Sequence, residues 1–340
     1  IFACVLLHEV GHTLHAQALG IPVRRIILLP IGGLAQLARL PEQPLDELRV
    51  AIAGPAANFG LALIFGGLAG VWMLAGPQAE SPREAARLAL QVTSPTPLGV
   101  LLYLTFANLG IAFFNLLPAF PMDGGRILRS LLALVLKRLT ATRIVTWLGW
   151  LLGLVFVLSG LGAAQRWGVP ASFGLALVGL FTLVGASVEE TMEKSRLALR
   201  RIPARAAVRQ PTWVLSPTDR LSPALAATAF QLQTVLPVVV STRLVGLLTR
   251  KDLTAAFQRD GVSIVAHIMR TQFPYIQADE DLWHAQQLLA GADLSALPVL
   301  DGEALYGMLT SADIRTARLD PPSTLRIAEP IFIPGGNPTL

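Results

Sequence analysis

The sequence predicts a multi-pass bundle of membrane α-helices with a short re-entrant β segment, followed by a soluble α+β tandem module. Hydrophobic residues make up 53% of the 340 residues and charged residues only 14%, and the mean hydropathy is +0.57. An ordinary soluble domain carries about 25% charged residues, so this composition indicates a membrane protein. Charge-free runs dominate the first part of the chain, whereas the last part is more polar and contains an internal repeat.

Basic residues outnumber acidic ones, which gives a net charge of +5 and an isoelectric point near 10.0. Such values can indicate a nucleic-acid-binding protein. Here the basic residues flank apolar runs and form no continuous stripe, so we interpret them as cytoplasmic-loop charges and expect no nucleic-acid partner. Cys4 is the only cysteine. This excludes an internal disulfide and a cysteine-based metal site.

Apolar runs predict several membrane spans, which reach or exceed the roughly 18–20 residues that a bilayer core requires. They are 1–19, 50–79, a helix from about 98 within the run 88–122, 144–165 and 167–188. The first run begins without an initiator Met. We therefore expect an N-terminally truncated chain that lacks part of this first helix and a further helix before it.

The segment RRIILLPIGGLAQLARL (24–40) differs from the spans around it. It is partly β-branched and is interrupted by Pro30, Gly32 and Gly33. This pattern favours a hairpin-like or re-entrant strand pair over a helix. Non-helical backbone near a membrane is tolerated only against protein or a water-filled cavity. We therefore expect the segment to lie beside a functional site, where an exposed edge could pair with an extended substrate. An ordinary interfacial loop is the alternative.

Arginine and lysine predict the orientation of the spans. The connection 123–143 and the segment 194–209 are both rich in these residues, which places both in the cytoplasm. Working back from there, the loop 80–87 lies outside and the loop 20–49 lies inside, so the first helix runs inward. We predict a multi-pass protein of the cell membrane whose soluble module is cytoplasmic.

The first helix contains the motif HEVGH, in which His8 and His12 are four residues apart. Two histidines with this spacing project from one helix face and can bind one Zn²⁺. Glu9 is not a ligand in this arrangement, but it can take a proton from the metal-bound water. The motif also occurs by chance in soluble helices. Ionisable residues in an apolar membrane segment are costly, however, and indicate a functional site. We therefore predict a metal centre.

A catalytic zinc ion usually has three protein ligands and one water, so a third ligand is needed. The candidates in the membrane part are His15, Asp46, Glu47, acidic residues of the loop 80–84, and Asp123. Asp123 lies at the inner end of a span that runs inward, as the first helix does. Both motifs therefore reach a similar depth, and we predict Asp123 as the third ligand. His15 is interpreted as a neighbour of the site or a loop-facing residue.

Three motifs together resemble the site-2 protease family of intramembrane zinc metalloproteases. They are HEVGH, AGPAANF (53–59) and the pattern N-x-x-P-x-x-x-x-D-G, which begins at Asn115 and includes Asp123. This combination is far more specific than H-E-x-x-H alone. The resemblance covers the chain up to about residue 190 and implies a transmembrane zinc metalloprotease domain over 1–192.

The resemblance also implies roles for individual residues. Those with a role in zinc binding or catalysis would be His8, His12, Asp123, Glu9 and Asn115. The two histidines and the aspartate would bind one Zn²⁺ per chain, and Glu9 would be the catalytic base. The amide of Asn115 would lie near the metal, where it could steady the substrate carbonyl or the oxyanion. Asn58 is a weaker candidate, for which a packing role is at least as well supported.

After about Pro203 the composition becomes that of a soluble domain, and two similar units follow. TVLPVVVSTRLVGLLTRKDL (234–253) aligns with LSALPVLDGEALYGMLTSADI (294–314), and each unit follows an amphipathic helical stretch, 221–233 or 281–291. A repeat with a period of about 60 residues predicts two β-β-α modules, each with a preceding helix, that share one core.

The two units resemble a tandem pair of CBS domains, which we place at 205–260 and 261–320, with a linker at 193–204 and an irregular tail at 321–340. Some CBS pairs bind an adenine nucleotide such as ATP or AMP through Ser/Thr-x-x-Asp, and others bind nothing, so both outcomes stay open. The residues in these positions are Thr249, Asp252, Thr310 and Asp313. CBS pairs commonly associate face to face, so we expect a homodimer.

Together these patterns predict an intramembrane zinc metalloprotease that is regulated by a cytoplasmic CBS pair. The expected partners are the lipid bilayer and a single-span membrane protein already trimmed by another protease, such as an anti-sigma factor. The alternative is a CBS-regulated membrane transporter or channel. That alternative does not explain the metal motif, and the other spans contain no further acids or histidines to line a path. A catalytically inactive family member is disfavoured because the motif is complete.

Overall fold

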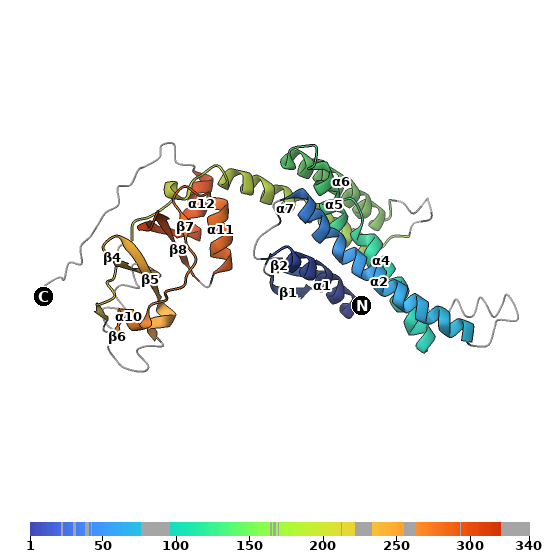
Figure 1. Ribbon diagram of the computed structural model, residues 1–340. Coiled ribbons are helices and arrows are strands. Elements are labelled where there is room, and N and C mark those ends of the chain that lie inside the picture. The colour runs from blue at the N-terminus through green and yellow to red at the C-terminus, as the bar shows by residue number, and fades with distance from the viewer. Residues whose placement is uncertain are drawn as a thin grey trace. The chain divides into compact units, whose positions relative to one another are not determined.

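The computed structural model shows two compact units, Ile1–Lys194 and Ser195–Leu340 (Figure 1). It describes the whole chain except residues 22, 30–31, 38–40, 42, 76–95, 164, 166–167, 169, 212, 222–232, 255–262, 293 and 321–340. Each unit is described separately below.

The first unit is helical. Its helices are α1 (Phe2–Ala18), α2 (Pro44–Ala75), α4 (Pro97–Asn115), α5 (Asp123–Leu132), α6 (Arg138–Gly160) and α7 (Phe173–Leu199), the last of which continues into the second unit. The long helix α2 packs against α1 on one side and against α4 and α5 on others, and α5 also contacts α6 (Figure 1). Helix α2 therefore contacts both helices that carry the predicted metal ligands, α1 with HEVGH and α5 with Asp123.

Helices α2, α4, α6 and α7 are each long and apolar enough to cross a membrane. Helix α1 has 17 residues, the lower limit for a helix that crosses the hydrocarbon core. Large apolar side chains such as Leu63, Leu74 and Trp147 are exposed on this unit. Exposure of such side chains is unfavourable in water but not in lipid, which agrees with the membrane prediction. The predicted outer loop 80–87 lies outside the described residues.

Several helices extend beyond the apolar runs because they continue into polar residues. Asp46 and Glu47 lie in the first turn of α2, where carboxylates suit the positive end of the helix dipole. Thr96 precedes α4, and its hydroxyl accepts a first-turn backbone N–H at 3.1 Å. Helix α7 runs to Leu199, so the first part of the segment 193–204, predicted as a linker, is helical.

The segment between α1 and α2 forms an antiparallel hairpin, which confirms the predicted strand pair. Its strands are β1 (Val23–Leu29) and β2 (Gly32–Leu37), and Leu29 pairs with Gly32 at the closed end. Both strands contact α1, the helix that carries HEVGH (Figure 1). The hairpin therefore lies next to the metal-motif helix.

The second unit contains a five-stranded sheet in the order β4-β5-β9-β8-β7. Its strands are β4 (Val235–Val240), β5 (Arg243–Thr249), β7 (Ile276–Gln277), β8 (Ala296–Asp301) and β9 (Ala304–Thr310). The hairpins β4-β5 and β8-β9 have the same register, and Val235 pairs with Thr249 as Ala296 pairs with Thr310. This equivalence confirms the internal repeat.

Short elements complete this unit. They are η3 (Ala204–Ala206), the strand pair β3 (Arg220–Leu221) and β6 (Ser263–Ile264), and the helices α10 (Val265–Ile268), α11 (Leu282–Gly291) and α12 (Ser311–Leu319). Helix α11 confirms the helix predicted at 281–291. Of the helix predicted at 221–233, residues 222–232 lie outside the described residues and Leu221 belongs to strand β3. The tail 321–340 also lies outside the described residues. Leu199, at the end of α7, is buried in one core with Leu282, Leu297 and Leu309.

Candidate metal centre

Two turns of α1 present both histidines of HEVGH on one side of the helix. The spacing of four residues is close to one helical turn, so the two side chains lie one above the other. His8 and His12 are buried, and their Nε2 atoms are 3.1 Å apart. Glu9 is also buried, with 8% of its surface exposed. The helix thus supplies two nitrogen ligands and a carboxylate within an apolar segment.

The third group comes from α5, whose first residue is Asp123. Its Oδ2 atom lies 3.0 Å from Nε2 of His8 and 3.1 Å from Nε2 of His12. Metal–ligand bonds of about 2.0–2.2 Å in a tetrahedral site place neighbouring ligand atoms about 3.3 Å apart. The observed triangle therefore fits a zinc ion with small adjustments. Among the described residues, these three form the group of side chains placed to hold a metal.

Helix α2 leaves room for this triangle because it has a glycine where it meets α1. A Cβ atom at Gly54 would lie 2.2 Å from Nε2 of His12 and 2.7 Å from Nε2 of His8. Any larger residue would occupy the position of the ligand atoms. At the start of α5, a Cβ at Gly124 would lie 2.3 Å from the carbonyl oxygen of Leu116. Glycine at these positions lets both helices reach the centre.

Each histidine uses its second ring nitrogen to contact α2. Nδ1 of His12 lies 2.7 Å from the carbonyl oxygen of Val50, and Nδ1 of His8 lies 2.5 Å from Oδ1 of Asn58. Asn58 was a weaker sequence candidate, and the structure places it in contact with a predicted ligand. Asn108, which bonds Asn58, was not predicted. The feature of the sequence that could have pointed to Asn108 is an amide side chain within an otherwise apolar span.

Two other predicted or considered residues lie differently. The Nδ2 group of Asn115 donates to the carbonyl oxygen of Ile111 at 3.0 Å, within its own helix α4. Its catalytic role therefore stays a prediction. His15 is exposed on α1, and it is not part of the triangle formed by His8, His12 and Asp123.

Similarity to known proteins covers the unit that contains this triangle. The model of peptidase family M50 matches residues 1–160, and the CBS domain model matches residues 265–320. A zinc metalloprotease of Methanocaldococcus jannaschii is 33% identical over 210 residues, which are 60% of this chain and 52% of the relative. The structure of a site-2 protease from the same organism has 34% sequence identity, covers 56% of this chain and 74% of that chain, and gives a TM-score of 0.40. The unit that carries the triangle matches peptidase family M50 over residues 1–160.

Other similarities cover smaller parts. Stage IV sporulation protein FB of Bacillus subtilis is 34% identical over 125 residues, which are 36% of each chain. The crystal structure of CBSX2 in complex with AMP has 24% identity, covers 35% of this chain and 96% of that chain, and gives a TM-score of 0.31. The chain spans about half the length of the M. jannaschii metalloprotease relative, 52%.

A buried group of charges in the same unit holds α5, the helix that starts with Asp123. Arg129 of α5 forms ion pairs with Glu47 of α2 and, at 3.1 Å, with Glu189 of α7. Arg138 of α6 forms an ion pair with the same Glu47, at 2.7 Å. The guanidinium of Arg129 also lies 4.9 Å from the ring centre of Phe120. These contacts join α2, α5, α6 and α7 near the metal-ligand helix.

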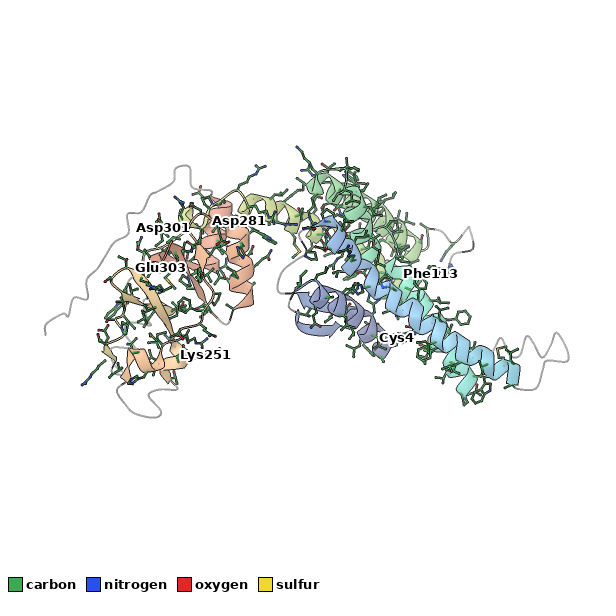
Figure 2. The ribbon with its side chains drawn as sticks, in the orientation of Figure 1. Cys4, Phe113, Lys251, Asp281, Asp301 and Glu303 are labelled. Atoms are coloured by element: carbon green, nitrogen blue, oxygen red, sulfur yellow. The ribbon has the colours of Figure 1, made fainter. Side chains whose placement is uncertain are left out.

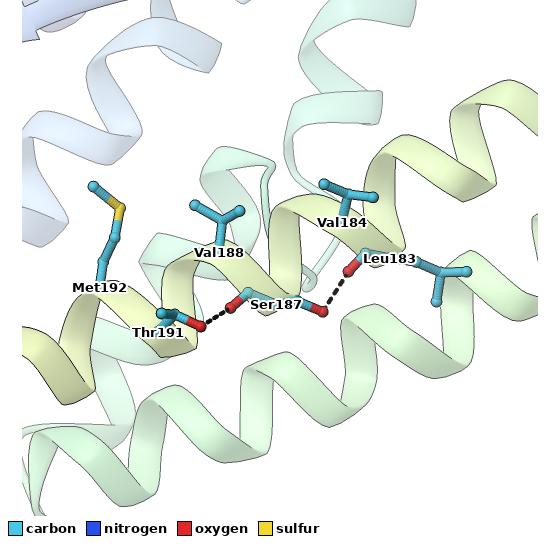
Figure 3. Close-up of a pocket in the computed structure, with 6 residues that line it drawn as sticks. All are labelled: Leu183, Val184, Ser187, Val188, Thr191 and Met192. Carbon is cyan, nitrogen blue, oxygen red and sulfur yellow. Dashed lines mark hydrogen bonds between the residues drawn. The ribbon is translucent and has the colours of Figure 1, made fainter.

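A hollow of about 430 Å³ runs along α7, but its lining has no part in the metal centre (Figure 3). The lining residues are Leu183, Val184, Ser187, Val188, Thr191 and Met192. Its hydroxyls bond the backbone of α7 itself, since Ser187 donates to Leu183 and Thr191 donates to Ser187. The hollow is therefore not a candidate for the metal site.

The CBS unit brings the predicted Thr-x-x-Asp residues together in each repeat. The Thr249 hydroxyl donates to Asp252 Oδ2 at 2.6 Å, and the Thr310 hydroxyl donates to Asp313 Oδ2 at 2.5 Å. In the second repeat this contact is part of a capping box that starts α12, a motif in which two side chains bond the first-turn backbone. The two repeats thus form equivalent polar corners at the ends of β5 and β9.

An arginine from the opposite repeat pairs with each of these aspartates. Arg270 binds Asp252 through both carboxylate oxygens, at 2.9 and 3.0 Å, and Arg209 forms an ion pair with Asp313. Both arginines also pair through their backbone with the strand of the other repeat. Burial raises the pKa of Asp252, but hydrogen bonds from Arg270 and Thr249 outweigh it and lower that pKa. Sequence analysis missed these arginines because they lie far from their partners along the chain.

Proposed function

We propose that this chain carries the catalytic centre of an intramembrane zinc metalloprotease whose activity is regulated by its CBS pair. One observation carries the proposal: Asp123 meets His8 and His12 within 3.0–3.1 Å in a unit of apolar helices. The match of residues 1–160 to peptidase family M50 supports the same reaction class. The whole protein's activity and substrates are part of the proposal, since the chain spans about half of a curated relative.

His8, His12 and Asp123 would hold one Zn²⁺, with a fourth position left for water or substrate. Bound zinc supplies Lewis-acid polarisation of the scissile carbonyl and lowers the pKa of water. Glu9 takes a proton from the attacking water and delivers it to the leaving amine. The amide of Asn115 donates to the developing oxyanion after a side-chain rotation that releases Ile111. The second proton of the water passes from the new carboxyl group to the amine, so the products are a carboxylate and a protonated amine, and atoms and protons balance.

The β1-β2 hairpin suits an extended substrate. It contacts α1, the helix that carries both histidines. A strand edge provides backbone donors and acceptors to a peptide that has left its helical conformation. This matters because helical peptide bonds are already hydrogen-bonded and shielded. The proposed substrate is a single-span membrane protein such as an anti-sigma factor, unwound locally where it is cut.

The CBS pair is proposed to bind an adenine nucleotide such as AMP or ATP at two equivalent corners. Asp252 and Asp313 would accept from ribose hydroxyls, and Arg270 and Arg209 would bind phosphate after releasing these carboxylates. The match of the CBS domain model to the second repeat supports the ligand class. The unit would lie in the cytoplasm, because the adjoining loops are positively charged. It would also pair with a second copy, since CBS pairs commonly associate face to face.

The proposal is tested by cleavage of a reporter that carries one transmembrane helix, with the full-length protein in liposomes. Wild type is expected to cut the reporter and Glu9→Gln to leave it intact while still binding zinc. Equal cleavage by both proteins would refute the proposed role of Glu9. Transport of ions into protein-containing vesicles, with no cleavage of any single-span reporter, would favour the transporter alternative.

A further inference from the structure

The two zinc-binding histidines differ in what holds the ring nitrogen that faces away from the metal. Nδ1 of His12 lies 2.7 Å from the backbone oxygen of Val50. A carbonyl oxygen can only accept, so this nitrogen donates. Nδ1 of His8 lies 2.5 Å from the side-chain oxygen of Asn58. The orientation of His8 therefore depends on a side chain that can be substituted, whereas that of His12 depends on backbone.

The direction of the Asn58 amide is determined by a second buried amide. Nδ2 of Asn108 donates to the carbonyl oxygen of Leu104 at 2.7 Å, so Oδ1 of Asn108 faces the other way. That oxygen accepts from Nδ2 of Asn58 at 2.7 Å. Oδ1 of Asn58 must then face His8 as an acceptor. The backbone carbonyl thus fixes the hydrogen-bond direction along the whole chain of groups.

We propose that Asn58 and Asn108 are positioning residues that fix His8 with its proton on Nδ1. In this tautomer Nε2 keeps its lone pair, and that atom lies 3.0 Å from Asp123 Oδ2 in the ligand triangle. The inference rests on the proposed zinc site and adds residues to it. It concerns metal binding, and Asn58 and Asn108 are not assigned any contact with the substrate.

Burial and the cost of polar groups support a role beyond packing. Asn58 and Asn108 are both 0% exposed, within helices α2 and α4 that are apolar enough to span a membrane. Buried amides in such helices are costly unless they are bonded. Cys4, which lies on α1 one turn before His8 (Figure 2), is the second acceptor of Asn108, at 3.2 Å. The amide pair therefore ties α1, α2 and α4 together at the ligand.

The test measures zinc affinity directly, by chelator competition with the full-length protein in detergent. Asn58→Leu keeps the approximate size of the side chain and removes the acceptor for His8. Partners that orient a metal ligand typically contribute about 10–100-fold in affinity. We expect the Kd for zinc to rise by this factor, and the absorption bands of the Co²⁺-substituted protein to shift. At saturating zinc, KM for a reporter peptide is expected to stay unchanged.

A double variant separates a chain of hydrogen bonds from two independent packing effects. Asn108→Leu is expected to weaken zinc binding less than Asn58→Leu, because Asn58 can still turn its oxygen to His8. Adding Asn108→Leu to Asn58→Leu is expected to weaken binding no further, since the path to His8 is already broken. Additive losses would overturn the proposed chain.

Two further variants keep the inference falsifiable. Asn58→Asp restores an acceptor for His8 and is expected to bind zinc more tightly than Asn58→Leu. If Asn58→Leu does not fold, the Kd for zinc of Asn58→Asp and of Asn108→Leu is compared with that of wild type instead. A wild-type Kd in Asn58→Asp and a raised Kd in Asn108→Leu would support the positioning role. Thr146→Val is the control. It removes a buried hydroxyl on α6 in place of a buried amide, and it is expected to leave the Kd for zinc unchanged.

The outcomes distinguish this inference from the proposed function. Wild-type affinity in Asn58→Leu, together with lost zinc binding in His8→Ala, would overturn the positioning role and leave the zinc protease intact. Equal zinc affinity of wild type and His8→Ala would overturn the proposed metal site and this inference with it. A raised Kd in Asn58→Leu with unchanged KM supports positioning through His8.

Discussion

At the level of single residues, the proposed metal centre depends on one glycine as much as on the three proposed ligands. Gly54 lies on α2 where a side chain would enter the space of His8 and His12. A helix interior normally disfavours glycine by about 1 kcal/mol relative to alanine. Glycine is found at this position despite the cost, because the helices and the ligand atoms come too close for a side chain.

Gly54→Ala should therefore abolish zinc binding with little loss of helix content. The added Cβ would lie 2.2 Å from Nε2 of His12, so a ligand must move. Zinc binding by chelator competition and helix content by circular dichroism check this. Gly60→Ala is the matched control on the same helix, because nothing lies within 4 Å of its added Cβ. Equal zinc affinity of both variants would contradict the close approach.

The CBS corners are also decided by single residues, and here pH provides a test. Although burial opposes it, hydrogen bonds from Arg270 and Thr249 lower the pKa of Asp252 from its usual 3.8. A lowered folded-state pKa contributes stability above the unfolded pKa, and this stability is lost as the pH falls through the folded pKa. The Asp252 contribution is thus present at neutral pH and disappears below pH 3.8.

Wild type should therefore melt at a higher temperature than Asp252→Asn at pH 7, and the difference should shrink as the pH falls below 3.8. Thermal unfolding of the full-length protein followed by tryptophan fluorescence measures this. Asp301→Asn is the control, since Asp301 is exposed at the end of β8 (Figure 2). Surface substitutions of this kind usually change stability by less than about 0.5 kcal/mol. A melting-temperature difference that grows as the pH falls would contradict the lowered pKa assigned to Asp252.

At the level of elements, helix α5 is held by buried charges. It begins with Asp123, the proposed third ligand. Further along the helix, the side chain of Arg129 is 7% exposed and pairs with Glu47 and Glu189. Breaking a buried ion pair leaves charges without partners, which costs more than the intact pair contributes. The position of α5 relative to α2 therefore depends on these charges.

Arg129→Ala should lower the free energy of unfolding by about 3–5 kcal/mol, because two buried carboxylates lose a partner. Arg143→Ala is the matched control, since the Arg143 side chain is 56% exposed and lies 3.7 Å from Glu190. An exposed pair of this kind should contribute at most about 1 kcal/mol. Thermal unfolding in detergent compares the two variants. Similar losses in both would show that burial does not determine the effect.

For the molecule as a whole, the chain combines a membrane unit with a duplicated soluble unit. The duplication places Arg270 against Asp252 and Arg209 against Asp313, so both repeats contribute to each corner. A single repeat contains only part of either corner. This arrangement predicts two nucleotide sites per chain that can be removed one at a time.

Calorimetric titration with AMP is expected to give two sites per chain in wild type and one in Arg209→Ala, because the variant loses the phosphate-binding arginine of one corner. Arg243→Ala serves as the control. Arg243 is 66% exposed and pairs with Glu303, away from both aspartates. Two sites in Arg209→Ala would contradict the proposed pairing of repeats.

Patterns along the chain were sufficient to predict the apolar helices, the hairpin between the first two, the proximity of Asp123 to His8 and His12, and the repeat. These patterns are apolar runs, glycine and proline breaks, the i, i+4 spacing of His8 and His12, and the recurrence of Thr-x-x-Asp. Charge bias and a shared depth led to Asp123, which the structure places 3.0 Å from His8.

The groups that surround those residues became evident from the packing of the helices alone. Asn58 and Asn108, 50 residues apart in the chain, meet from two different helices, and Arg129 reaches Glu47 across 82 residues. Such contacts depend on how closely and at what rotation two helices pack, which local periodicity does not specify. An amide or an arginine in one segment carries no mark of its partner in another, so the hydrogen bonds that orient the ligands emerged only when the helices were packed.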